Sequence, residues 1–467
     1  MLLNPYRFGS GTAPIAPNAI GGLKLWLDAQ VGVFKAGIAA QFTIANSEYL
    51  SRASNSSLQT GDIDWTIAGW FKFDGGGSQC IVSKDSATSG KREYQLTYFV
   101  GPTNAVLGQV FTATDVARQV SSAGIPTANT WFFFTFWHDA AANTINLEFN
   151  ANGSIISTNT TGALQAASDA EFRLGSNAFS GSPLYLGGAE QAIGFWKRTL
   201  TSGEKTFLYN SGNGRNYSEL SAGDKTSMVS WWALNETSGT RNDSHGTNHL
   251  TDNNTVTSSI GPVLPGTTAG SGDFVGDWRD QSGLNSHAYT RNGSAPTLST
   301  SVASLNSQNA LNFNAGPFMA SAESAAVKPF TFALVVRPAS LASTRTFVGN
   351  NLGTGVNIQF IASNVWAIGV GGVQVGAGDA LSASTSYILF VSYDGLGNYV
   401  YRKNSAAVSS GTNNQTPAAS ITWIGLSGAG LFPADSLIAE VIKYDNVISA
   451  GDRSGLEAYL SAKYGIV

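Results

Sequence analysis

The chain has 467 residues, of which 42% are hydrophobic and only 12% are charged, and it contains 53 glycines. This composition argues against a disordered protein and suits one or two globular domains built from short strands and tight turns. The formal net charge of -4 is spread without acidic or basic blocks, which argues against nucleic-acid binding, and no apolar run is long enough for a membrane span.

Residues 1–21 are punctuated by glycine and proline and show neither a helical nor a strand period, so we expect an N-terminal arm. The stretch from Met1 to Gly9 lacks the basic and apolar regions of an ordinary secretion signal, and we expect the chain to fold in a cytosol. The opening Asn4-Pro5-Tyr6-Arg7-Phe8 resembles the start of many phage and prophage virion-associated proteins that continue into laminin-G-like domains.

Two segments that lie far apart in the chain have the pattern of one hairpin. The segment 22–29 contains Leu25-Trp26-Leu27-Asp28, and the segment 273–283 contains Trp278-Arg279-Asp280-Gln281-Ser282-Gly283. Together they resemble the laminin-G-like (concanavalin A-like) jelly-roll family, in which an L-W-L-D-A strand is followed after a short turn by a W-x-D-x-S-G segment. The resemblance implies that a whole extra domain is inserted between the two halves.

The segment that begins near Gly37 has the pattern of a β-sandwich. Apolar side chains alternate on one face of 65–73, which predicts a strand. The run 131–137 is apolar on both faces, so it predicts a central strand that is covered on both sides. We expect a turn at 139–143 to lead into a partner strand at 144–150.

The end of this segment resembles the opening hairpin of the same family, moved to the end of the domain. The residues 228–236 run into 243–248, and they would supply the strand that the outer domain takes from 22–29. The residues 258–272 are rich in glycine and proline and predict a linker, after which the outer domain resumes at Asp273.

The second domain repeats the order of the first. Its segments 330–337, 385–394 and 448–452 correspond to 65–72, 131–137 and 200–204. Thr201 and Glu204 form a capping-box pattern, which predicts a short helix that stops near Gly212. Ser449 begins a second predicted helix that ends at Gly465. Three landmarks in the same order favour a tandem repeat.

The sequence therefore predicts an all-β chain of two concanavalin A-like (laminin-G-like) jelly-roll sandwiches, the first inserted into the second, each with a short helix. The predicted boundaries are an N-terminal arm at 1–21, a discontinuous outer sandwich at 22–36 plus 273–467, an inserted sandwich at 37–257 and a linker at 258–272.

The related glucanases carry paired carboxylates in an E-x-D-x-x-E strand, and this pattern is missing from the sequence. The nearest pairs are Asp62 with Asp64 and Asp277 with Asp280. Both stand beside turn-forming residues, so we expect them to form strand-entry turns. We predict a protein without enzymatic activity and assign no catalytic residue.

Other reactive residues give no stronger signal. Cys80 is the only cysteine, which excludes an intrachain disulfide, and we expect it to be a buried strand residue. His245 and His249 are four residues apart without a helical period, so we expect a surface turn in place of a zinc pair. Most aromatic residues alternate inside apolar strands. The tryptophans that this pattern does not place in a core are Trp232, Trp366 and Trp423.

Calcium is the one metal that the resemblance implies, because laminin-G-like domains often hold one at the rim through an Asp, an Asn and backbone oxygens. Asp280 with Asn285, or Asp243 with Asn248, could supply such oxygens. The same residues could instead form Asx-turns that close a hairpin. Both interpretations stay open, so we assign no metal ligand, no cofactor and no ligand-binding residue.

The resemblance and the opening sequence together predict a non-enzymatic structural protein at the virion surface of a phage, as a tail-fibre, tail-tip or capsid-decoration component. Its expected partners are other virion proteins, held through the N-terminal arm, and host-surface glycans bound by lectin-like domains. The sequence leaves homo-oligomerisation open. The alternatives are a bacterial surface carbohydrate-binding adhesin and a polysaccharide-degrading enzyme.

Overall fold

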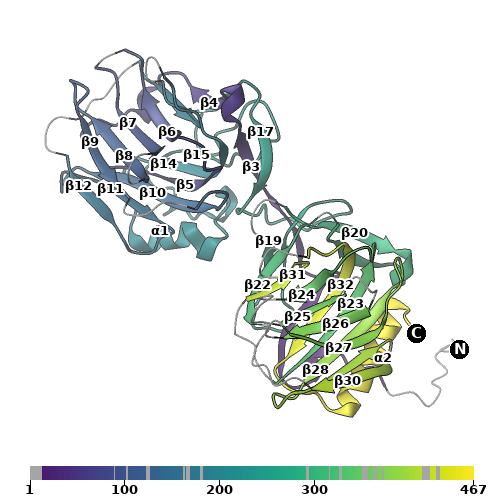
Figure 1. The fold of residues 1–467 in the computed structure, drawn as a ribbon. Helices are drawn as coiled ribbons and strands as arrows, with labels where there is room; N and C mark the ends of the chain where they lie inside the picture. Colours follow the sequence, from purple (N-terminus) through teal and green to yellow (C-terminus); the bar gives the residue numbers. More distant parts are fainter. Residues whose placement is uncertain are drawn as a thin grey trace, which may run out of the picture. The chain divides into compact units, whose positions relative to one another are not determined.

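The computed structural model describes residues 13–88, 90–100, 104–122, 127–160, 164, 169–178, 182–290, 294–314, 316–324, 329–349, 356–360, 365–370, 373–412, 421–426 and 432–467. The chain divides into two compact units, which Figure 1 shows as ribbons. The outer unit consists of Met1–Lys35 and Gly266–Val467, and the inner unit consists of Ala36–Pro265. The inner unit is therefore inserted into the outer one.

The inner unit is a sandwich of two antiparallel sheets. Its eight-stranded sheet has the order β12 (Ile156–Asn159), β11 (Thr144–Phe149), β10 (Phe132–Asp139), β5 (Trp65–Phe73), β14 (Gly188–Trp196), β3 (Gly37–Phe42) and β17 (Thr257–Gly261), and β15 (Met228–Trp232) also pairs with β14. Its seven-stranded sheet has the order β16 (Thr251–Asn253), β4 (Tyr49–Arg52), β13 (Glu171–Leu174), β6 (Gln79–Asp85), β7 (Tyr94–Phe99), β8 (Ala105–Phe111) and β9 (Ala117–Ser121).

The outer unit is a second antiparallel sandwich. Its eight-stranded sheet has the order β20 (Thr297–Val302), β21 (Gln308–Asn312), β32 (Ser436–Tyr444), β23 (Phe330–Pro338), β28 (Tyr387–Tyr393), β29 (Asn398–Lys403) and β30 (Ala406–Thr412), and β1 (Leu23–Asp28) also pairs with β32. Its nine-stranded sheet has the order β2 (Val33–Lys35), β18 (Val275–Trp278), β19 (Ala288–Thr290), β22 (Met319–Ser324), β31 (Ile421–Ile424), β24 (Arg345–Gly349), β25 (Val356–Phe360), β26 (Val365–Val370) and β27 (Val373–Ala380).

The two strand orders match one for one. β12 to β17 of the inner eight-stranded sheet correspond to β30 to β20 of the outer one, and β15 on β14 corresponds to β1 on β32. The inner seven-stranded sheet corresponds to the path from β19 to β27, to which the outer unit adds β2 and β18. The counterparts of β1, β19 and β20 come last in the inner unit, so its chain order is a circular permutation of the outer one.

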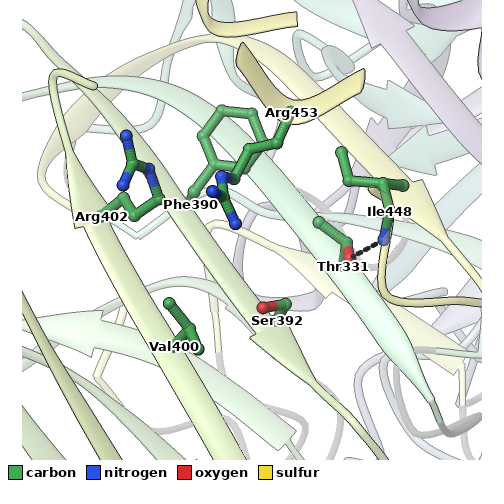
Figure 2. A pocket seen from close by; sticks show the side chains of 7 residues that line it. All are labelled: Thr331, Phe390, Ser392, Val400, Arg402, Ile448 and Arg453. Atoms are coloured by element: carbon green, nitrogen blue, oxygen red, sulfur yellow. Dashed lines mark hydrogen bonds between the residues drawn. The ribbon is translucent and has the colours of Figure 1, made fainter. Parts of the chain in front are cut away.

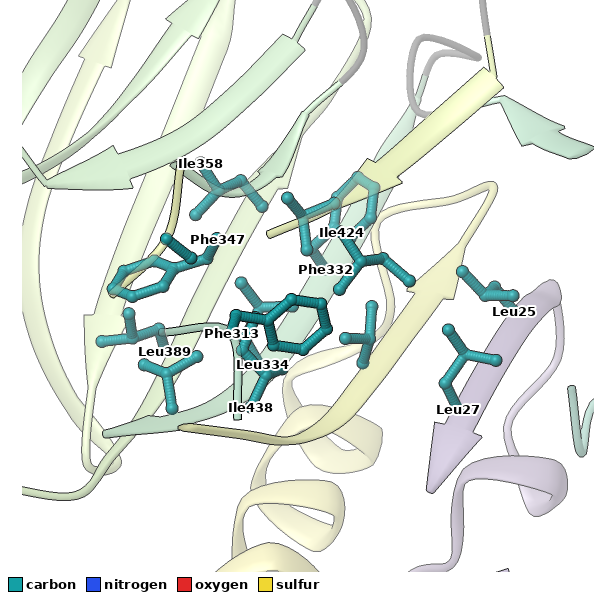
Figure 3. Close-up of a cluster of buried hydrophobic side chains, with 14 of the residues drawn as sticks. Leu25, Leu27, Phe313, Phe332, Leu334, Phe347, Ile358, Leu389, Ile424 and Ile438 are labelled. Carbon is teal, nitrogen blue, oxygen red and sulfur yellow. The ribbon is translucent and has the colours of Figure 1, made fainter. Parts of the chain in front are cut away.

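Each unit has a core between its sheets and a smaller apolar layer under a helix. Figure 3 shows the outer core, in which Leu25 and Leu27 of β1 join residues of both sheets such as Phe332 and Phe347. On the opposite face of the outer eight-stranded sheet, Leu456 and Leu460 of α2 (Ala450–Tyr464) form a second cluster. Leu208 of α1 (Ser202–Tyr209) does the same in the inner unit. Burying each such side chain stabilises the fold by about 1.5–3 kcal/mol.

Both predicted helices begin at the predicted caps. The Thr201 hydroxyl accepts a hydrogen bond from Glu204 N, and the Glu204 carboxylate accepts one from Thr201 N, so the capping box is complete. Ser449 caps α2, and Gly465 ends it in the left-handed conformation. The predicted central strand is also confirmed, since β10 lies between β5 and β11. Short 3-10 turns occupy Pro17–Ala19, Ile44–Asn46, Ser56–Leu58, Asn210–Gly212, Tyr217–Glu219 and Ala303–Leu305.

Two predicted segments differ from the structure. The region 258–272 was expected as a linker, but Thr257–Gly261 forms β17, which pairs with β3. The predicted arm is folded from residue 13 onward: Ile15 N bonds to Gly455 O, and Ile20 is buried against the α2 layer. Glycine and proline usually indicate turns and loops, so both segments were predicted without regular structure. In the structure these residues lie in or beside an edge strand and in a packed segment. The first part of the arm lies outside the described residues.

Two chain segments connect the units, one at 35–36 and the other at 265–266. Lys35 N bonds to Thr267 O just before the chain enters the inner unit, and Gly37 pairs with Gly261 just after it. A Cβ at Gly37 would lie 2.0 Å from Val263 O, so the close approach of the two segments requires glycine. Among the described residues, no helix has the length and apolarity that crossing a membrane demands.

Candidate functional site

Asp280, one of the candidate calcium residues, closes the loop that joins the two distant halves of the predicted hairpin. Its Oδ1 accepts hydrogen bonds from Trp26 N and Ser282 N, both at 2.9 Å, and its Oδ2 accepts one from Ser286 N at 3.0 Å. Leu27 forms a β-bridge with Asp280 itself. The carboxylate therefore ties β1 to the segment that follows β18. Asn285 lies in the same loop with a left-handed backbone.

Asp243 does the same in the inner unit. Its carboxylate accepts hydrogen bonds from the backbone N–H groups of Trp231, His245, Gly246 and Asn248. Burial raises the pKa of this carboxyl, but the four N–H groups outweigh burial, and the pKa lies below its usual value. Asn248 donates its own amide protons to Ser57 and Ser230.

The Asx-type loop is therefore the arrangement that the structure has at both candidate calcium positions. The carboxylate oxygens are occupied by backbone N–H groups, which a cation would have to displace. Within the described ranges, no cluster of three or more His, Cys, Asp or Glu side chains is placed to hold a metal ion.

The carboxylate pairs considered for catalysis serve separate structural roles. Asp64 accepts a hydrogen bond from Ala140 N, whereas the side chain of Asp62 is 52% exposed. Asp277 is buried beside Arg279 at 3.0 Å, and burial raises the pKa of Asp277 above its usual value. Its pair member Asp280 is engaged with the loop described above.

The histidines and the cysteine also have separate environments. His245 contacts the Tyr217 hydroxyl at 3.0 Å, and His249 Nδ1 accepts a hydrogen bond from Asp243 N at 3.1 Å. Cys80 is fully buried on β6, and burial raises the pKa of its thiol. These residues do not form a shared reactive centre.

The three tryptophans that the sequence pattern did not assign to a core differ in their environments. Trp232 is fully buried and stacks on Phe172 at 4.8 Å between ring centroids. The side chain of Trp366 lies outside the described residues. Trp423 is half-buried on β31 and contacts Phe318 at 5.1 Å. Of the two tryptophans whose side chains the structure describes, Trp423 remains a candidate for a binding surface.

A polar row crosses the side of the inner seven-stranded sheet that points away from the core. We call this side the inner free face because it carries no helix, although Ser176 and Asn177 contact it by hydrogen bonds to Ser83 and Gln95. Paired residues on neighbouring antiparallel strands share one face. The register places Thr251, Ser51, Arg173, Ser83, Gln95, Gln109 and Gln119 in one row from β16 to β9. Their sequence neighbours, such as Leu50, Leu96 and Val120, lie in the core.

The side chains of this row form a connected set. Gln95 donates to Gln109 Oε1, and Gln109 donates to Gln119 Oε1 at 3.1 Å. The Arg173 guanidinium lies 4.5 Å from the centroid of the Tyr49 ring and bonds to Glu171 at 2.6 Å. The row thus has a half-buried aromatic ring and a guanidinium on β4 and β13, and the amides of Gln109 and Gln119 on β8 and β9.

The outer unit has an equivalent row on its nine-stranded sheet, the outer free face. The register places Tyr289, Ala320, Trp423, Gly349, Asn357 and Gly369 in line. Leu174 pairs with Leu50 in the inner unit, and Ile424 pairs with Met319 in the outer unit. The residues just before these pairs therefore correspond: Trp423 to Arg173, and Phe318 to Tyr49. A Cβ at Gly349 would lie 2.1 Å from Asn357 Oδ1, so glycine at this position makes room for the Asn357 side chain. Arg173 on Tyr49 and Trp423 on Phe318 are thus matched pairs.

Sequence reasoning singled out Trp423 but missed the other members of both rows. A local signal exists, because Gln95 and Gln109 alternate with core residues on their strands. That signal identifies outward positions but not which strands are neighbours. The row is assembled by register between segments that are distant in the sequence.

Comparisons with models of known protein families and with curated proteins gave no match. Among solved structures, the chain is similar to a heptameric SAP-like pentraxin from Limulus polyphemus, with 13% identity, a TM-score of 0.30 and coverage of 37% of this chain and 82% of that chain. It is similar to a Bacteroides ovatus protein described as carbohydrate-binding, with 15% identity, a TM-score of 0.38 and coverage of 49% and 61%.

A third similar structure is domain 4 of an extracellular arabinanase from Geobacillus stearothermophilus in complex with arabinotriose, with 16% identity, a TM-score of 0.31 and coverage of 40% and 93%. Each of these matches covers less than half of the present chain. TM-scores this low carry no argument about function, so the jelly-roll assignment rests on the two-sheet topology described above.

Proposed function

We propose that the protein is a non-enzymatic structural component of a phage virion, in a tail fibre, at the tail tip or as a capsid decoration. Its two sandwiches bind glycans of the host surface through the inner and outer free faces. Contacts with other virion proteins are made by the N-terminal arm.

The matched pairs on the two free faces support glycan binding. Tyr49 with Arg173, and Phe318 with Trp423, stand at the same place on two topologically equivalent sheets. Sugar rings offer a flat C–H face to an aromatic ring and hydroxyl groups to amides and charged groups. The helix of each unit packs on the other sheet, so neither α1 nor α2 covers a free face.

The virion setting is supported by the opening Asn4-Pro5-Tyr6-Arg7-Phe8, which resembles virion-associated proteins and lies outside the described residues. Mass spectrometry of purified virions tests this part, and a map of the assembled particle gives the position. Absence of the protein from purified virions, together with a gene beside export machinery, would favour the adhesin.

Glycan binding is tested with the full chain on an array of bacterial surface polysaccharides. We expect Trp423→Ala and Tyr49→Ala each to weaken binding about tenfold, because each removes an aromatic contact surface. Leu396→Ala is the matched control, since it removes an apolar side chain that is 84% exposed in a turn. Unchanged binding in both aromatic variants refutes the free faces as the site.

The enzymatic alternative has its own test. Incubation with the polysaccharides that bind on the array is followed by an assay for reducing ends. We expect no release. Release that requires a carboxylate of this chain would replace the proposal with a polysaccharide-degrading enzyme.

A further inference from the structure

The outer unit contains a pocket on the face of its eight-stranded sheet that carries α2, opposite to the outer free face. The enclosed part of the pocket has a volume of about 10 Å³, enough for one water-sized group such as a carboxylate oxygen, and the rest opens to solvent. It is lined by Thr331, Phe390, Ser392, Val400, Arg402, Ile448 and Arg453. Figure 2 shows Arg453 reaching from the start of α2 toward Ser392, with the hydrogen bond from Ile448 N to the Thr331 hydroxyl beside it.

The charges around this pocket are unevenly paired. Arg402 donates to both carboxylate oxygens of Glu457, at 2.6 and 3.1 Å, and to Ser405 O. Within the described part of the chain, the guanidinium of Arg453 has no ion pair or hydrogen bond, and its Nε is buried without a partner. Two guanidinium groups and one carboxylate leave a net charge of one positive unit at the pocket. Burying an unpaired donor costs free energy that a ligand could recover.

In the inner unit, side chains of the protein itself fill the position that corresponds to this pocket. Trp137 pairs with Thr66 and with Asn146, as Ser392 pairs with Thr331 and with Val400. By the same register, Glu148 stands at the position of Arg402. Lys205 stands at the position of Arg453, because each is the fourth residue after its helix N-cap.

In the inner unit this place is closed and neutral. Lys205 forms a buried ion pair with Glu148, and its ammonium lies 4.2 Å from the Trp137 ring centroid. The outer unit has serine where the tryptophan fills space and arginine where the glutamate supplies a carboxylate. Serine in place of tryptophan opens a cavity. Arginine in place of glutamate removes the carboxylate that would pair with Arg453 of α2.

We propose that the pocket in the outer unit binds a carboxylate group, which pairs with Arg453 as Glu148 pairs with Lys205 in the inner unit. The Ser392 hydroxyl lies on the strand beneath it as a second hydrogen-bond donor. A guanidinium binds a carboxylate through two parallel N–H groups, so one planar anion satisfies Arg453. The carboxylate comes either from a free small acid or from an acidic sugar, and this site does not depend on the glycan binding proposed for the free faces.

The test is a ligand-observed NMR titration of the full chain with glucuronate, acetate and glucose. We expect glucuronate to bind and glucose not to bind. Equal binding of acetate identifies a free carboxylate as sufficient, and tighter binding of glucuronate identifies the acidic sugar. Arg453→Gln is expected to lose binding by about tenfold or more, because the charge-assisted hydrogen bonds are removed.

Two variants keep the test interpretable. Arg215→Gln changes the net charge by the same amount in the inner unit and is expected to leave binding unchanged. Ser392→Trp fills the cavity without removing a charge and is expected to abolish binding, with the unfolding temperature confirming that it is folded. Binding that persists in Arg453→Gln, or glucuronate that binds no better than glucose, overturns the proposal.

Discussion

The two units differ most where the edge strand β1 or β15 meets its partner and the helix. In the outer unit, Lys463 of α2 lies between the carboxylates of Asp28 and Glu440, at 2.6 and 2.8 Å. In the inner unit the register places Ala233 and Ala192 at the positions of these carboxylates. α1 ends at Tyr209, so it has no residue that corresponds to Lys463. The same backbone plan is thus held by an ion cluster in one unit and by small apolar residues in the other.

The other matched positions follow the same rule. Arg173 and Trp423 occupy equivalent positions on the free faces, and Glu148 and Arg402 occupy equivalent positions beside the helices. The hydrogen-bonded strand order is kept, while the chemistry at each exposed or half-buried place is different. A sandwich core needs apolar residues of suitable volume at alternating positions, and this requirement leaves the remaining positions free for separate functions.

The largest expected effect is at the ion cluster. Lys463→Met leaves the buried carboxylates of Asp28 and Glu440 without their cation, so we expect the outer unit to lose about 3–5 kcal/mol of unfolding free energy. Hydrogen exchange followed by mass spectrometry measures this loss separately in each unit. The triple variant with Asp28→Ala and Glu440→Ala copies the inner unit and is expected to recover most of the loss. Equal protection in the single variant and the wild type would contradict the prediction.

The next effect concerns Glu190, which is fully buried in the inner core where the outer unit has Ile438. Burial raises its pKa well above the usual value, and the backbone N–H of Gly175 offsets this rise only in part. We expect Glu190→Ile to stabilise the inner unit by about 1–3 kcal/mol at neutral pH.

Because of Glu190, we expect the stability of the inner unit to change with pH in one direction. The folded state keeps a proton that the unfolded chain releases above about pH 4.3, so wild-type stability falls as pH rises from that value, by at most about 1.36 kcal/mol per pH unit. Urea unfolding of wild type and Glu190→Ile from about pH 4 to about pH 8 measures the difference. A stability difference that does not change with pH would show that Glu190 titrates normally.

A smaller effect is expected at the helix caps. Thr201→Ala and Ser449→Ala each remove a hydroxyl that accepts a backbone hydrogen bond, and each should cost about 1 kcal/mol. Only Thr201 belongs to a complete capping box, in which the Arg198 hydrogen bond lowers the pKa of Glu204. We therefore expect the larger loss of amide protection in α1. A larger loss in α2 would contradict the comparison.

The smallest effect is expected from removing calcium. Backbone N–H groups occupy the carboxylates of Asp243 and Asp280, so a chelator should leave the unfolding of both units unchanged. Calorimetry with and without the chelator measures this. Destabilisation that calcium reverses, and that Asp280→Asn removes, would restore the metal-binding interpretation.

Local signals in the sequence predicted the elements that depend on a few neighbouring residues. The caps at Thr201 and Ser449 and the doubly apolar strand β10 are of this kind. The residues 258–261 were wrongly predicted as linker, because an edge strand rich in serine has little apolar pattern. The free faces and the Arg453 pocket could not be predicted, since they depend on which strands become neighbours. Register between distant segments is a property of the whole sheet.

The insertion also fixes an order of events during synthesis. Leu23 pairs with Tyr444, so β1 leaves the ribosome long before its partner strand exists. The inner unit, whose first strand β3 pairs with its own last strand β17, is complete once Pro265 has emerged. The nascent chain therefore carries one finished sandwich while the apolar side chains of β1 still await cover. Release before residue 436 would leave them exposed to chaperones or to other chains.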